Sequence, residues 1–170
     1  MARVDYIDPS TASERTQDLL QKNGHKNIFR MLAHSESHLL NYCRLGAAIR
    51  HKGELDPVLR ELAITRAGIL CEADYEIIAH KRIGEDVGVR HAQNAALDAW
   101  QESAEFSAQE QTVLRFTDEV VTSNRPSDEV FAAVSAILSP GALVELHLAI
   151  GYYVMTSKFL RTFDIDLETH

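Results

Sequence analysis

The sequence is poor in the residues that break regular structure, with eight glycines and four prolines among 170 residues. Because glycine and proline mark turns, their scarcity argues against many tight hairpins and favours long helices. Cysteine is also rare. Cys43 and Cys71 are far apart in sequence and form neither a CxxC pair nor a metal-finger spacing. We therefore expect a cytoplasmic protein with reduced thiols.

Concentrated positive charge and long apolar runs are missing as well. The formal net charge is −8 and the basic residues are scattered, which argues against nucleic acid or an anionic membrane surface as a partner. The most apolar run, residues 142–155, contains Glu145 and His147 and is too short to span a bilayer. The first ten residues lack a basic segment followed by an apolar one, so we expect no signal peptide.

What the sequence does contain is a helical period almost throughout, with no sustained strand alternation. No repeat and no linker divides the chain, so we predict one all-α domain over residues 1–170, a helical bundle. Hydrophobic residues make up 45% of the chain, enough for one substantial core. The helices are expected at 12–22, 27–35, 36–51, 57–70, 75–87, 90–101, 108–123, 127–138 and 142–163.

Four helix boundaries carry local signals. Asp56 followed by Pro57 is a typical helix start, with a capping side chain before proline at the first helical position. Asp74 is the expected N-cap of the next helix, and Gly88 is its expected C-terminal stop. Ser107 with Glu110 three residues later predicts a capping box.

Glu76 and His80 are the polar pair of greatest chemical interest. They are four residues apart in CEADYEIIAH, so they share a helix face that continues to the apolar Ile83 and Val87. The pair therefore faces the core. A partly buried histidine that is simply hydrogen-bonded by a neighbour remains an alternative interpretation.

Glu61 adds a third residue. It lies mid-helix beside apolar residues, where a carboxylate is often solvated or paired with Arg60 or Arg66. If helices 57–70 and 75–87 form a hairpin, however, Glu61 reaches His80. A carboxylate that holds an imidazole in one tautomer is a working acid–base arrangement.

The segment LRELAITRAGILCEADYEIIAHKRIGEDVGV, residues 59–89, resembles the carboxymuconolactone decarboxylase family, which includes alkylhydroperoxidase D (AhpD). The resemblance covers roughly residues 28 to 168 and implies an AhpD-like helical bundle. The redox branch of that family carries a glutamate, then CxxC, then a histidine four residues after the second cysteine. Glu61 and His80 match the glutamate and the histidine, whereas the two cysteine positions are occupied by Ala73 and Glu76.

The loss of both cysteines distinguishes a peroxidase from a decarboxylase-type enzyme. A dithiol peroxidase needs one thiolate to attack the peroxide and a second thiol to resolve the sulfenic acid. Without both sulfurs, we expect no peroxidase activity by the CxxC route. Tyr75 and Glu76 with His80 resemble a non-redox subgroup that has a Tyr-Glu-x-x-x-His form.

The resemblance implies a cofactor-free, decarboxylase-type enzyme acting on a small carboxylated or lactone-like molecule. His80 is the expected proton donor or acceptor, with Glu61 orienting it and Glu76 as a second acid–base group. Family members commonly form homo-oligomers, trimers or hexamers, and the apolar last helix favours that here. The candidate substrate-binding residues are Arg66, which suits a carboxylate, together with Tyr75 and His147.

Other functions remain open. One is a peroxiredoxin-like antioxidant that uses Cys71, although both cysteines are expected to be core residues. Another is a non-catalytic oligomeric binding protein that has kept the fold. His34 and His38 are also four residues apart and can present two imidazoles to a metal, but two ligands do not make a site, and we predict no metal centre.

Overall fold

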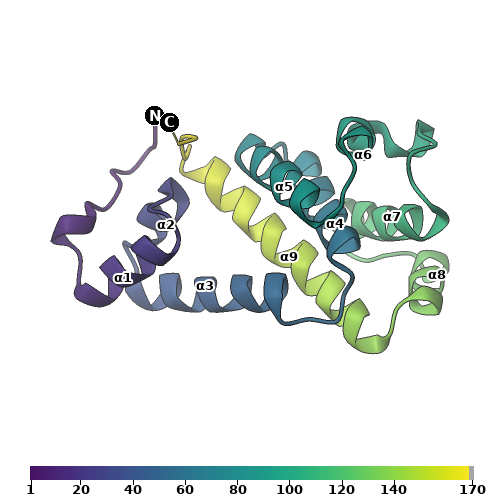
Figure 1. Ribbon diagram of the computed structural model, residues 1–170, viewed down its shortest axis with the longest axis horizontal. Coiled ribbons are helices and arrows are strands. Elements are labelled where there is room, and N and C mark those ends of the chain that lie inside the picture. Colours follow the sequence, from purple (N-terminus) through teal and green to yellow (C-terminus); the bar gives the residue numbers. More distant parts are fainter. Residues whose placement is uncertain (169–170) are drawn as a thin grey trace. The chain divides into compact units, whose positions relative to one another are not determined.

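The computed structural model describes residues 1–168, which form helices joined by turns and contain no strand (Figure 1). The all-α prediction is confirmed. The chain divides into two compact units. One comprises residues 1–48 with the C-terminal segment from residue 159, and the other comprises residues 49–158.

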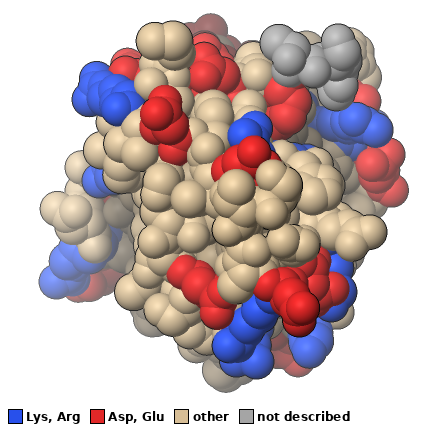
Figure 2. All heavy atoms as spheres, turned by 90° about the vertical axis from the view of Figure 1, so that its left-hand side faces the viewer, with Lys and Arg blue, Asp and Glu red and all other residues tan. Residues whose placement is uncertain are grey.

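The first unit is built from the N-terminal helices. These are a short 3-10 helix (Pro9–Thr11), α1 (Glu14–Lys22), α2 (Asn27–Leu32) and most of α3 (Glu36–His51). The C-terminal segment is hydrogen-bonded to them. The amide of Arg3 donates to the Phe163 carbonyl at 2.9 Å, and the amide of Asn27 donates to the Glu168 carboxylate at 2.8 Å. Figure 2 views the molecule from the left-hand side of Figure 1, and acidic and basic side chains are intermingled there, with no continuous basic area among the residues that are not grey.

The second unit is organised around α4 (Pro57–Leu70). Ten successive residues of this helix, Leu59 to Gly68, are buried, so polar side chains in this stretch are enclosed whichever way they point. The remaining elements are α5 (Asp74–Val87), α6 (His91–Ala96), a 3-10 helix (Leu97–Glu102), α7 (Ala108–Ser123), α8 (Asp128–Ile137) and most of α9 (Pro140–Thr162). Figure 1 shows α5 running beside α4.

Two apolar clusters enclose α4. The larger joins α4, α7, α8 and α9, and the smaller joins α4 and α7 to the 3-10 helix and the turns beside it. Burying such side chains is the main stabilising contribution to the fold. The larger cluster contains Leu55, Leu59, Ala63, Val113, Phe116, Val130, Val134, Ala142, Leu146 and Ile150. The smaller contains Leu62, Val89, Leu97, Trp100, Phe106 and Leu114.

Three of the four boundary signals are confirmed. The Asp56 carboxylate accepts hydrogen bonds from the amides of Val58 and Leu59, ahead of α4. Gly88 ends α5 in the left-handed region at φ 113°, a conformation that favours glycine. The capping box at the start of α7 is formed.

Two local predictions are wrong. Ala73, not Asp74, is the N-cap of α5, so Asp74 lies inside the first turn, where a negative charge is favoured by the helix dipole. The helix expected at 90–101 ends at Ala96 and continues as a 3-10 helix with a non-helical residue at Ala99. The tighter 3-10 winding places residues three apart on one side, which buries Leu97 and Trp100 together.

Candidate active site

Helices α4 and α5 form the hairpin that the sequence suggested, and two glycines lie where they approach each other. A Cβ added at Gly84 of α5 would lie 3.2 Å from a Val89 methyl group and 3.5 Å from the Glu61 Cβ. A Cβ at Gly68 of α4 would lie 3.4 Å from the Glu76 Cβ. The helices therefore pack closely at the level of Glu61 and Glu76.

Glu61 and His80 meet across this hairpin. The Nδ1 atom of His80 lies 2.7 Å from Oε2 of Glu61, and the residues are 4% and 0% exposed. A carboxylate can only accept a hydrogen bond, so Nδ1 carries the proton. Nε2 is then the ring nitrogen left to face another group.

Glu61 is held ionised although it is buried. Burial on its own would raise the pKa of Glu61, but the hydrogen bond and charge of His80, together with those of Arg60, outweigh it and hold this pKa below its ordinary value. Nε of Arg60 donates to Oε1 of Glu61 at 3.0 Å. Glu61 is therefore paired with Arg60, one of the two partners that the sequence offered, and is not solvated.

Glu76 lies at the other nitrogen of the imidazole. Its Oε2 is 3.4 Å from Nε2 of His80, and the residue is 4% exposed. The imidazole is therefore flanked by one carboxylate at each ring nitrogen, and a proton on Nε2 lies next to a second group that can take it. This arrangement can give and receive protons in a site screened from water.

Sequence reasoning missed two residues of this cluster. Tyr153 of α9 packs edge-on against His80, with ring centroids 4.4 Å apart and an interplanar angle of 74°. Arg50, near the end of α3, donates from Nη1 to the Tyr153 hydroxyl at 3.2 Å. The only sequence signal was that Tyr153 shares an apolar helix face with Leu146 and Ile150, a pattern that indicates burial but no partner.

The structure does not bring the predicted substrate-binding residues together. Arg66 donates to both carboxylate oxygens of Asp118, at 2.6 and 3.2 Å, and to the carbonyls of Leu97 and Asp98. His147 is exposed on α9. Tyr75 is buried in the first turn of α5.

The two cysteines belong to different helical segments. Cys71 is the C-cap of α4 and Cys43 belongs to α3, and both are free thiols. The prediction that both are core residues is wrong, because both side chains are only partly buried.

His34 and His38 lie in the other unit, at the rim of an apolar cavity of about 420 Å³ that also contains Phe159 and Phe163. Nε2 of His34 donates to the Asp5 carbonyl at 2.8 Å, and Nδ1 of His38 is 2.7 Å from the Ser35 hydroxyl. Within residues 1–168, no three histidine, cysteine, aspartate or glutamate side chains are gathered as a metal site would require.

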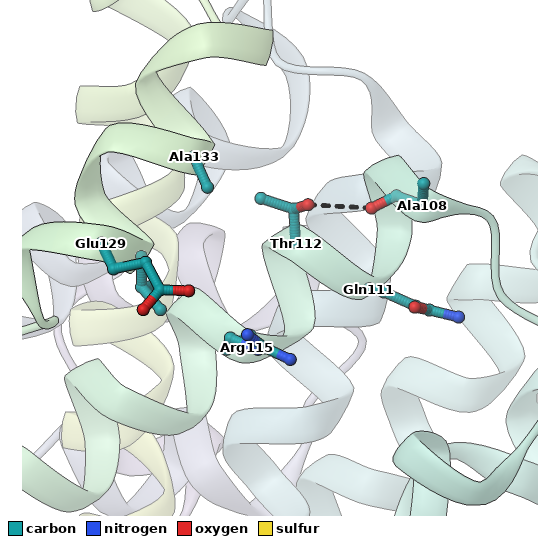
Figure 3. Close-up of a pocket in the computed structure, with 7 residues that line it drawn as sticks. Ala108, Gln111, Thr112, Arg115, Glu129 and Ala133 are labelled. Atoms are coloured by element: carbon teal, nitrogen blue, oxygen red, sulfur yellow. Dashed lines mark hydrogen bonds between the residues drawn. The ribbon is translucent and has the colours of Figure 1, made fainter.

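A second cavity, of about 280 Å³, lies between α7 and α8 (Figure 3). Arg115 and Glu129 line it, and the Thr112 hydroxyl beside them donates to the Ala108 carbonyl at 2.8 Å. None of the candidate acid–base residues lines either cavity. Among the described residues, no helix has the length and apolar character needed to cross a bilayer.

The helical arrangement is an AhpD-like fold. Residues 38–119, just under half of the chain, match the model of the carboxymuconolactone decarboxylase family, and this segment contains Glu61 and His80. Among curated proteins, none matches the sequence.

Solved structures share the fold at low sequence identity. A peroxidase-related protein of Ralstonia eutropha with an AhpD core has a TM-score of 0.85 and 15% identity, over 98% of this chain and 92% of its own. A peroxidase-related protein of Silicibacter has a TM-score of 0.84 and 12% identity, over 99% and 92%. The debrominase Bmp8, solved as a cysteine-to-alanine variant with 2,3,4-tribromopyrrole, has a TM-score of 0.80 and 17% identity, over 99% and 95%.

Proposed function

We propose that this protein is a cofactor-free acid–base enzyme that decarboxylates a small carboxylated or lactone-like molecule. The observation that carries the proposal is the buried series Glu61, His80 and Glu76, with a carboxylate at each nitrogen of one imidazole. Burying two carboxylates around a histidine costs stability unless hydrogen bonds offset it, which makes such clusters candidates for function. The related debrominase is a protein of the same fold that binds a small ring compound.

The three residues have distinct roles in this reaction. Glu61 fixes the tautomer and orientation of the ring through Nδ1. His80 delivers a proton from Nε2 to the carbon that has lost CO₂, and Glu76 exchanges the proton with Nε2 between turnovers. Because all three residues are at most 4% exposed, substrate reaches Nε2 only when surrounding side chains move.

The experiment is a screen of small lactone acids and conjugated keto acids for CO₂ release by the purified protein. We expect turnover of at least one such acid, and we expect His80→Asn to reduce kcat about 100-fold, the scale of lost general acid–base catalysis. The matched control is His91→Asn, which changes a surface histidine that pairs only with the exposed Glu85. Failure of the wild-type protein to release CO₂ from any compound of this class would reject the decarboxylase proposal.

We further propose that the protein forms a homo-oligomer, a trimer or hexamer. Val144, Leu148 and Met155 of α9 are 47–59% exposed and are spaced so that they follow one helix face. Three large apolar side chains aligned on one exposed face favour contact with another protein surface. The occupant proposed here is a second copy of the chain.

A further inference from the structure

Tyr153 is the buried polar residue that the acid–base mechanism above leaves without a role. It lies on α9, is 3% exposed, and presents its ring to the imidazole of His80. It also packs against the Tyr152 ring, with centroids 5.1 Å apart. Its ring is therefore held in place at the candidate active site.

The hydroxyl proton of Tyr153 has no acceptor among the described residues. The guanidinium of Arg50 can only donate, so in the Arg50–Tyr153 hydrogen bond the phenol oxygen is the acceptor. That leaves the hydroxyl proton for another partner, and no hydrogen bond from it to residues 1–168 is formed. Because the bond from Arg50 uses only the phenol oxygen, the hydroxyl can still donate its proton to a ligand.

The protonation state of Tyr153 suits a donor. Burial raises the pKa of Tyr153 to about 12, with Arg50 acting to lower it and the carboxylates of Glu76 and Glu61 acting to raise it. The hydroxyl is therefore neutral at ordinary pH and acts as a donor, not as a base. The ring contact with His80 places Tyr153 beside the acid–base residues.

We propose that the Tyr153 hydroxyl, held by Arg50, donates a hydrogen bond to the oxyanion that forms when the substrate loses CO₂ beside His80. This inference rests on the proposed function. The C–C bond to the carboxylate breaks, and its electron pair moves into the conjugated carbonyl to give an enolate whose oxygen accepts from Tyr153. His80 then gives its Nε2 proton to the carbon as the carbonyl reforms, and a proton from solvent returns to Nε2 by way of Glu76. Overall, one carboxylate and one proton become CO₂ and one C–H bond.

A neutral phenol is well suited to this step. A preorganised donor aimed at developing negative charge stabilises the transition state more than the ground state, and it works best where water is excluded. Arg50 is partly exposed, so the hydroxyl end of Tyr153 is close to a side chain that solvent can reach. In the proposed complex, Arg50 donates to the Tyr153 hydroxyl, and this hydroxyl donates to the substrate oxygen. His80 holds the proton for the neighbouring carbon.

The test uses 4-nitrophenolate as an oxyanion probe, whose absorbance reports its ionisation. Full-length wild-type protein should bind the probe and lower its apparent pKa, because a hydrogen bond to the anion favours the ionised form. Tyr153→Phe should weaken phenolate binding at least tenfold, whereas Tyr152→Phe, which removes the adjacent buried hydroxyl, should not. Thermal unfolding of both variants confirms that they remain folded.

The outcomes separate this inference from the proposed function. Equal phenolate affinity in Tyr153→Phe and wild type, or no binding by wild type, overturns the role of Tyr153 even if His80-dependent CO₂ release is found. Loss of phenolate binding in Tyr153→Phe supports that role even if no acid is decarboxylated. With an active substrate, Tyr153→Phe should lower kcat about 100-fold with KM little changed, as for loss of an oxyanion donor.

Discussion

Glu61 is the residue on which the candidate site depends most. It has no contact with solvent, and its charge is compensated by Arg60 on one oxygen and His80 on the other. Removing one partner from a buried ion pair leaves the others without a counter-charge, which costs more than a surface pair contributes. Glu61 therefore links the stability of the protein to the orientation of His80.

We predict that Glu61→Gln lowers the free energy of unfolding by about 3 kcal/mol at pH 7. Because folding lowers the pKa of Glu61 below its ordinary 4.5, its contribution is present above about pH 4.5 and is lost as pH falls through the folded-state pKa. Urea unfolding at several pH values should show a smaller acid-induced loss in the variant than in the wild type. Glu129→Gln, at the exposed edge of the α7–α8 cavity, is the control and should change little. An identical pH dependence in Glu61→Gln and wild type would contradict this assignment.

A substitution of the single residue Cys71 tests the alternative redox function. The account predicts that Cys71→Ser leaves CO₂ release unchanged, since the proposed proton transfers use Glu61, His80 and Glu76, whereas Cys71 is the C-cap of α4. Peroxide consumption should be equally low in wild type and variant. Peroxide consumption by wild type that Cys71→Ser abolishes would favour the antioxidant function instead.

At the scale of elements, the site depends on how closely α4 and α5 pack. His80 and Gly84 are one turn apart on α5, and Gly84 faces Glu61. We predict that Gly84→Val pushes the helices apart, lowers stability by about 1–3 kcal/mol and weakens the Glu61–His80 hydrogen bond. The control is Asp86→Val, which places the same β-branched side chain at an exposed position of α5, where it meets no neighbouring helix. Equal stability and activity in the two variants would show that close packing at Gly84 does not matter.

Helices α4 and α5 also show which features of the fold and site could be predicted from the sequence. Local signals such as Asp56 before Pro57 predicted helix boundaries because caps depend on adjacent residues. The spacing of Glu61, Glu76 and His80 predicted their meeting, because a helix hairpin places them on facing surfaces. Tyr153 and Arg50 could not be predicted, since their contact joins the end of α3 to α9 and no local pattern encodes a pairing 103 residues apart.

At the scale of the whole molecule, the account predicts an oligomer that uses the exposed face of α9. Leu148→Glu places a charge among Val144, Leu148 and Met155, and burying an unpaired charge is costly. We expect light scattering after size exclusion to show a trimer or hexamer for wild type and a smaller species for the variant. Arg82→Glu, at an exposed position of α5, is a charge-changing control on a different helix. A wild-type monomer at micromolar concentration would contradict the oligomer proposal.

The most direct test of the central claim is solvent-deuterium labelling of the decarboxylated product in D₂O. If His80 delivers the proton that replaces CO₂, wild-type protein should yield a product with one deuterium on one face of that carbon. His80→Asn should lose both the rate and the facial selectivity, while remaining folded by thermal unfolding. Unchanged rate and unchanged selectivity in His80→Asn would contradict the assignment of Glu61, His80 and Glu76 as the acid–base site.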